Sequence, residues 1–268
     1  MRAAMASLVL LNIRAVVWCQ PQPPADGPEF EVASIKLNKD DTGGSLARTP
    51  GGLTARNAEF IRLIERAFQT RQVDISRVPD PIRLARFDII AKASGKISGD
   101  GYWAMLRRLL EDRFQLAYHR ETRDVPLYAL GFRKTGAELG PKINRSADPN
   151  CPVNPSASDF CGVQVRLGML HGQRVSMPRI AQELTVFAGR PVQDQTGLAG
   201  AFDFQLTWTP DPFRSEDGKP KFLNGEPIDT SGPSLFTAIQ EQLGLKLEPR
   251  KGPVEFLVID HAEQPTEN

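Results

Sequence analysis

The second half of this chain repeats the apolar pattern of the first half, and this repeat constrains the fold more than any other feature. Residues 106–130 align without a gap with residues 235–259, and the segment 86–89 matches the segment 201–204. The coinciding positions include Leu106 with Leu235, Leu110 with Ile239, Phe114 with Leu243 and Leu130 with Ile259. Shared apolar positions indicate a duplicated core, and no constellation of reactive side chains is repeated with them. The repeat predicts two related modules and no particular reaction.

Each half contains two amphipathic helix patterns that alternate with strand patterns. The predicted helices cover residues 60–68, 103–114, 180–187 and 235–243; the predicted strands cover 30–36, 53–56, 87–92, 115–123, 125–132, 162–167, 172–175, 202–209, 245–248 and 254–260. Asn57, Ser176 and Ser234 are expected to cap helices. A tight turn is expected around Thr122–Asp124, and residues 245–260 are expected to form a second hairpin. This order predicts an α+β fold of two β-α-β-α-β-β modules, with the helices packed on one face of mixed sheets.

Composition changes along the chain predict where these modules begin and end. The expected organisation is a signal peptide at 1–19, a proline-rich spacer at 20–28, a first module at 29–133, a linker with a cysteine loop at 134–160, a second module at 161–262 and a tail at 263–268. The segments 37–52 and 210–233 are rich in glycine, proline and polar residues, and we expect them to be loops.

The N-terminus has the pattern of an export signal. Arg2 precedes the apolar run 3–11, and the best cleavage point follows Cys19. Two other interpretations stay open, namely a wrongly assigned start codon and an uncleaved anchor. No later stretch reaches the roughly 18 apolar residues of a membrane span. The sequence therefore predicts a periplasmic or secreted protein with no span after signal removal.

The overall charge gives no electrostatic reason to expect nucleic acid as a partner. The chain has 33 lysines and arginines against 32 aspartates and glutamates, which leaves a formal net charge of +1. The expected partner is an envelope protein or a small ligand. Composition does not determine the oligomeric state.

The two cysteines of the predicted mature chain favour a disulfide. Cys151 and Cys161 close a short loop, and such pairs in exported chains most often form disulfides worth roughly 2–3 kcal/mol. A two-thiolate metal site is the alternative, but the pair lacks CxxC spacing and no histidine is close in sequence. Nucleotide-binding glycine motifs are absent as well. We therefore expect no metal and no cofactor.

Four residues are the best candidates for catalysis. Asp88 and Asp203 occupy matching positions of the repeat, where a shared structural role, such as pairing with a neighbouring strand or loop, is favoured over acid–base chemistry. His119 lies in a charged stretch typical of a solvent-facing strand. His261 follows an aspartate and precedes Glu263, which favours a surface ion pair over half of a catalytic triad.

Several long blocks of this sequence carry a family resemblance. They are residues 30–36 (FEVASIK), 86–93 (RFDIIAKA), 109–130, 189–206 and 235–268. The chain resembles the paralogous family of exported proteins of unknown function found in soil acidobacteria. That resemblance implies a signal peptide, and it implies no activity, cofactor or catalytic residue. Residues 235–259 also resemble the second half of the short N-terminal domain of secretins and TonB-dependent receptors, whose small β-α-β units bind partner proteins.

These observations predict a non-catalytic binding module of the cell envelope. Exposed sheet edges would accept a partner strand, and a cleft between the two halves is the other expected binding place. Two alternatives stay open. One is an envelope hydrolase whose site is assembled from Asp88, Asp203, His119 and His261, and the other is a domain that senses a small ligand.

Overall fold

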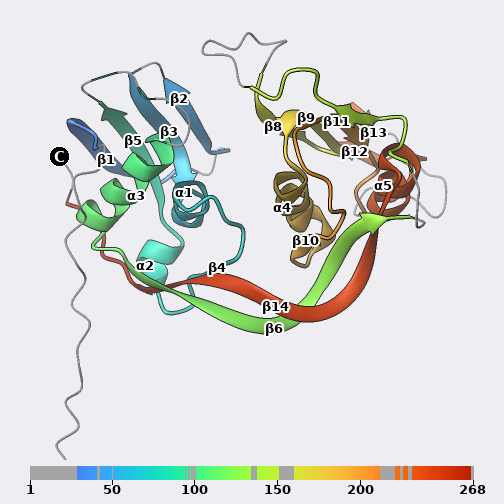
Figure 1. The fold of residues 1–268 in the computed structure, drawn as a ribbon. Coiled ribbons are helices and arrows are strands. Elements are labelled where there is room, and N and C mark those ends of the chain that lie inside the picture. The colour runs from blue at the N-terminus through green and yellow to red at the C-terminus, as the bar shows by residue number, and fades with distance from the viewer. Residues whose placement is uncertain are drawn as a thin grey trace, which may run out of the picture.

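Two lobes stand side by side on a long two-stranded ribbon that runs beneath both of them (Figure 1). The computed structural model describes residues 29–40, 43–49, 51–93, 95, 97, 101–133, 138–150, 160–211, 221–223, 226–228 and 231–266. The predicted signal peptide lies outside these residues. Within them, every helix is too short or too polar to cross a membrane.

The first lobe is an antiparallel sheet covered by helices. Its sheet has the order β1-β5-β3-β2, formed by β1 (Val32–Asn38), β5 (Arg86–Lys92), β3 (Gly52–Glu59) and β2 (Ser45–Thr49). Its other elements are α1 (Phe60–Ala67), β4 (Val73–Asp74), α2 (Asp80–Arg83) and α3 (Gly101–Arg113). The rings of Phe60, Phe87 and Phe114 meet at the centre, with Phe114 5.4 Å from Phe60 and 5.0 Å from Phe87. The apolar faces predicted for the helices at 60–68 and 103–114, which correspond to α1 and α3, pack against this core.

The second lobe has the same kind of construction. Its antiparallel sheet has the order β7-β11-β9-β8, formed by β7 (Ile143–Arg145), β11 (Phe202–Thr207), β9 (Met169–Val175) and β8 (Gly162–Arg166). Its other elements are α4 (Met177–Ala188), β10 (Val192–Asp194), the small hairpin of β12 (Lys221–Leu223) and β13 (Glu226–Ile228), and α5 (Leu235–Leu243). Ser234 caps α5 as predicted, because its hydroxyl accepts a hydrogen bond from the backbone N–H of Thr237.

The ribbon consists of two unusually long antiparallel strands, β6 (Ala117–Phe132) and β14 (Leu245–His261). Strand β6 runs through Thr122–Asp124, and β14 runs through the turn expected between residues 248 and 254, so both predicted hairpins are wrong. The strands continue because their ends enter different cores: Ile259 packs in the first lobe, and Leu130 and Leu245 pack in the second. Burial at both ends outweighs the local turn signals.

Short parallel strands flank the ribbon in both lobes. Strand β4 pairs with β14 where Val73 lies opposite Leu257, and β10 pairs with β6 where Val192 lies opposite Tyr128. Among the sheets formed by the described residues, only this ribbon sheet is mixed. The α+β class is confirmed, whereas the expectation that every sheet is mixed is wrong for the two antiparallel lobe sheets.

The register of the ribbon has an internal symmetry. Asp124 lies opposite Pro253 in the ladder, and these two residues also coincide in the gap-free alignment of the two halves. The hairpins β2–β3 and β8–β9 match as well: Thr49 faces Gly52 and Arg166 faces Met169, each across a two-residue connection. This is the geometry that a repeat would require. The duplication and the module boundaries themselves stay predictions.

Three local expectations are wrong. Asn57 does not cap a helix; it has φ 46° inside β3, and Glu59 is the residue before α1. The segment 37–52 is not a loop throughout, because it contains β2. The linker 134–160 contributes the edge strand β7 to the second lobe. In each case, pairing with another strand decides the local conformation.

Candidate ligand-binding cleft

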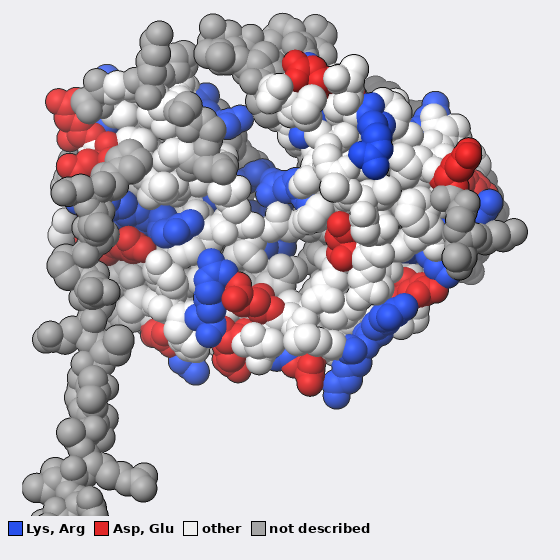
Figure 2. Space-filling view, in the orientation of Figure 1, with Lys and Arg blue, Asp and Glu red and all other residues white. Residues whose placement is uncertain are grey.

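The two lobes enclose a cleft made of two adjoining hollows of about 510 and 340 Å³. Both hollows are lined by β2 and α1 on the first lobe and by β8 and α4 on the second. Leu46, Arg66 and Arg71 border both hollows, so they lie where the two meet. Basic side chains gather in this opening between the lobes (Figure 2).

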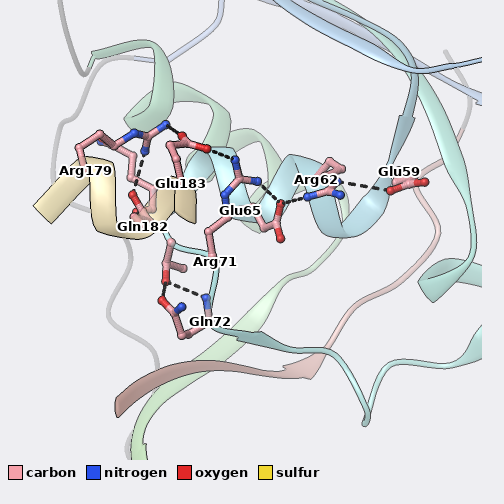
Figure 3. Close-up of polar contacts among 10 residues, drawn as sticks. Glu59, Arg62, Glu65, Arg71, Gln72, Arg179, Gln182 and Glu183 are labelled. Atoms are coloured by element: carbon pink, nitrogen blue, oxygen red, sulfur yellow. Dashed lines mark hydrogen bonds and ion pairs between the residues drawn. The ribbon is translucent and has the colours of Figure 1, made fainter. Parts of the chain in front are cut away.

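Arg71 links the lobes across the floor of this cleft (Figure 3). Its Nη1 donates to Glu65 Oε2 of α1 at 2.8 Å, and its Nη2 donates to Glu183 Oε2 of α4 at 2.9 Å. Arg179 holds the other oxygen of Glu183 at 2.6 Å, and Arg62 also donates to Glu65 at 2.8 Å. One arginine thus bridges two carboxylates, each of which has a second arginine as partner.

This bridge is largely withdrawn from water. The side chains of Arg71 and Glu183 are 12% and 3% exposed. Buried charges are tolerated only when they are paired and hydrogen-bonded, and here each buried charge has partners that link α1 to α4. Gln182 adds a second link, because its side-chain amide donates to the backbone oxygen of Gln69 at 2.5 Å.

Arg66 differs from its neighbours because its guanidinium has no hydrogen-bond or ion-pair partner within the described part of the chain. It is exposed to the cleft and borders both hollows. The walls of the cleft desolvate it, and Arg71 and Arg179 repel it, so the pKa of Arg66 lies below its ordinary value. An anion beside Arg66 would relieve this repulsion.

Positive charge is in excess among the side chains that line the cleft. The charged residues that line it are Arg48, Arg62, Arg66, Arg71, Arg86 and Arg179, together with Glu59, Glu65 and Glu183. Six arginines against three glutamates leave an excess of three positive charges in a chain whose net charge is only +1. A concave surface of one sign concentrates ligands of the opposite sign.

Apolar side chains share the larger hollow with these arginines. Val165 of β8 and Val186 of α4 are 49% and 44% exposed, and Leu46 and Phe187 lie beside them. Aliphatic side chains exposed next to fixed positive charges favour a ligand with both apolar and anionic parts.

The paired aspartates of the sequence analysis lie in the two lobe sheets, outside the cleft lining. Asp88 accepts a hydrogen bond from the backbone N–H of Asn57 at 2.7 Å, and Asp203 accepts one from the backbone N–H of Arg174 at 2.8 Å. Asn57 and Arg174 both have positive φ, at irregularities in the strand register. The hydrogen bonds from Asn57 and from the side chain of Asn38 hold the pKa of Asp88 below its ordinary value. Each aspartate thus satisfies the backbone of a β-bulge.

The two histidines lie at the first-lobe end of the ribbon. His119 Nδ1 is 2.6 Å from Asp260 Oδ2, and His261 Nε2 is 3.0 Å from Glu263 Oε1. Desolvation opposes ionisation of Asp260, but hydrogen bonds from His119 and Arg77 outweigh it and lower its pKa. The structure therefore brings His119 to Asp260, and it brings neither histidine to the cleft or to Asp88.

The predicted disulfide is not tested by this geometry. Cys151 lies outside the described residues, whereas Cys161 borders the smaller hollow. Among the described side chains, no three histidines, cysteines or carboxylates are grouped to hold a metal ion.

The arginines of the cleft are not among the site residues predicted from the sequence. Arg62 and Arg66 are one turn apart on the polar face of α1, and Arg71 follows four residues after its last residue. This basic stripe was the available signal. Glu183, the partner of Arg71, could not be found in this way, because a carboxylate on an amphipathic helix normally indicates a solvated face.

A family model for a protein of unknown function, DUF3738, matches residues 61–262, from α1 to the residue after β14. The chain belongs to the DUF3738 family. The match includes α1, α4, β8 and most of the arginines described above, so the cleft lies largely within the family domain. No curated protein and no solved structure matches the chain.

Proposed function

We propose that this DUF3738 protein is a non-catalytic binding protein of the cell envelope, and that its inter-lobe cleft binds a ligand with an anionic and an apolar part. The observation that carries this proposal is the unpartnered guanidinium of Arg66 beside exposed aliphatic side chains. A guanidinium that already lies in a cleft without a partner forms a hydrogen bond to a bound carboxylate or phosphate without first breaking an ion pair.

Export by the segment 1–19 and a place in the periplasm or outside the cell belong to this proposal. They rest on the signal pattern and on the resemblance to exported proteins of soil acidobacteria. The resemblance of residues 235–259 to secretin and receptor domains supports a binding role, since those units bind partners. The sensing alternative uses the same cleft and differs only in what binding triggers.

The hydrolase alternative has less support. Its four suspects lie at three separate places, namely the bulge of each sheet and the end of the ribbon. A catalytic site needs its groups within reach of one substrate atom.

Calorimetric titration with decanoate and with decanol tests the proposed function, because the two probes share a chain length and differ in charge. We expect decanoate to bind more tightly than decanol. Arg66→Gln should weaken decanoate binding at least about tenfold, since a hydrogen bond to a charged group contributes about 1.5–3 kcal/mol. Arg250→Gln makes the same charge change on the exposed ribbon and should leave binding within about twofold. Equal binding of the two probes, or no effect of Arg66→Gln, would refute the proposal.

A further inference from the structure

Two sheet edges face each other across the cleft. In the first lobe β2 is an edge strand, and in the second lobe β8 is an edge strand; within the described residues each of them pairs with a single neighbour. Both strands line both hollows, and Figure 1 shows them on the facing sides of the lobes. The gap between the lobes is therefore bounded by two strand edges that have no second neighbour within the described residues.

The hairpins determine which backbone groups point into this gap. A two-residue connection makes the closing pair a hydrogen-bonded one, and hydrogen-bonded pairs alternate with non-bonded pairs along the ladder. The closing pairs contain Thr49 in β2 and Arg166 in β8. The N–H and C=O groups of Arg48 and Val165, the residues before them, are therefore directed away from the hairpin partner and toward the gap.

Within the described residues, neither edge is blocked by a proline, a bulge or a covering strand. Natural edge strands are commonly blocked by proline, a bulge or a covering element. Strands β2 and β8 contain no proline, and their pairing with β3 and β9 is regular. Val165 in β8 and Leu167 in the turn that follows it are 49% and 54% exposed. An exposed apolar edge that borders a cleft is a template for an extended peptide.

We infer that the cleft binds an extended acidic peptide segment as an added strand between β2 and β8. This inference rests on the proposed function and names the ligand class. Charge complementarity selects an acidic segment, because six arginines line the cleft and Arg66 has no partner within the described residues. Both edges are five residues long, so about five residues of the ligand pair with them, a length of roughly 17 Å. Apolar side chains of the ligand would lie on Val165 and Val186.

A peptide pool tests this directly. Capped pentapeptides of the form X-Val-X-Val-X, where X is any amino acid, are mixed with the wild-type protein, with Arg66→Gln and with Arg250→Gln, and the retained peptides are sequenced by mass spectrometry. We expect the wild type and Arg250→Gln to retain peptides enriched in Asp and Glu at X. Arg66→Gln should lose this enrichment. An unbiased pool on the wild type would overturn the inference.

Backbone methylation then separates strand pairing from simple attraction of charge. The best peptide is made in two further forms, with N-methyl groups on its odd or on its even amides. Because alternate amides of an inserted strand face β2 and β8, each form should bind at least about tenfold more weakly. An effect of only one form would assign the peptide to a single edge, and an effect of neither form would exclude strand addition. Either result overturns the inference.

A protein variant gives the matching control. Val165→Pro removes an outward amide and is compatible with an edge strand, whereas Val165→Thr keeps the amide. We expect Val165→Pro to bind the peptide about tenfold more weakly than Val165→Thr, because the two variants both alter the side chain and differ in the outward amide; equal binding by the two variants would overturn the inference.

The decanoate titration distinguishes the two levels of the proposal. Decanoate binding that depends on Arg66, together with an unbiased peptide pool, would leave the proposed function standing and reject the strand. Failure of both would reject both. A concentration-dependent dimer that retains no peptide would assign the edges to a second copy of the chain and would also overturn the inference.

Discussion

The bridge made by Arg71 allows a sharp prediction about how the lobes are held together. Arg71→Gln removes two charge-assisted hydrogen bonds, one to Glu65 and one to Glu183. Removing one partner of a buried ion pair typically costs about 3–5 kcal/mol. Here each carboxylate keeps another arginine, Arg62 at 2.8 Å and Arg179 at 2.6 Å, so neither is left unpaired. The expected loss of unfolding free energy is therefore smaller, about 2–3 kcal/mol.

Urea denaturation followed by tryptophan fluorescence measures this loss. Arg250→Gln is the matched control, because it removes the same charge from an exposed pair with Glu248 and should change stability by less than about 1 kcal/mol. A double-mutant cycle with Glu183→Gln isolates the coupling between Arg71 and Glu183. A cost below about 0.5 kcal/mol for Arg71→Gln would mean that the pair is solvated and that the bridge does not fix the lobes.

Three further predictions follow from single contacts. Asp88→Ala leaves the bulge amide of β3 without its acceptor and should cost about 1–3 kcal/mol in urea denaturation, whereas an unchanged midpoint would show that water replaces the carboxylate. A Cβ on Gly172 would lie 2.1 Å from the ring of Phe204, so Gly172→Ala should lower the unfolding free energy by about 1–3 kcal/mol, and adding Phe204→Leu should recover part of this loss. Gly131 has open space around it, so Gly131→Ala should lower the unfolding free energy by less than about 1 kcal/mol, and equal costs for the two alanine variants would refute the steric argument. Hydrogen bonds from Ser76 and Arg123 lower the pKa of Asp74 to about 2, so the ionised carboxylate stabilises the fold fully above about pH 4 and less as the pH falls toward 2. Asp74→Asn should therefore lower the unfolding free energy by about 1 kcal/mol at pH 7 and by little at pH 2, and a pH-independent difference would contradict this.

Local periodicity predicted the helices well. The stripes of residues 60–68 and 235–243 correspond to α1 and α5, because burying one apolar face is the main source of stability for short helices. The capping hydroxyl of Ser234 was also predictable, since its partner, the backbone N–H of Thr237, lies only three residues away.

The ribbon shows where local signals mislead. Asp124, Pro249 and Pro253 are residues that normally favour turns, yet they lie inside two continuous strands. Proline is tolerated there because the middle of a two-stranded ribbon has open edges, toward which a missing N–H does no harm. Local signals also failed to predict β2. Its polar sequence is typical of a loop, but it forms a strand because it pairs with β3.

The sequence by itself determined the α+β class, the positions of the main helices and the repeated apolar pattern, because these depend on contacts between residues a few positions apart. Only the tertiary structure decided that the end strands of the two halves join into one ribbon and that β2 faces β8. It alone also placed Glu183 on Arg71, 112 residues away in sequence, and left Arg66 without a partner among the described residues. These features depend on which distant surfaces bury each other, and periodicity carries no information about that choice.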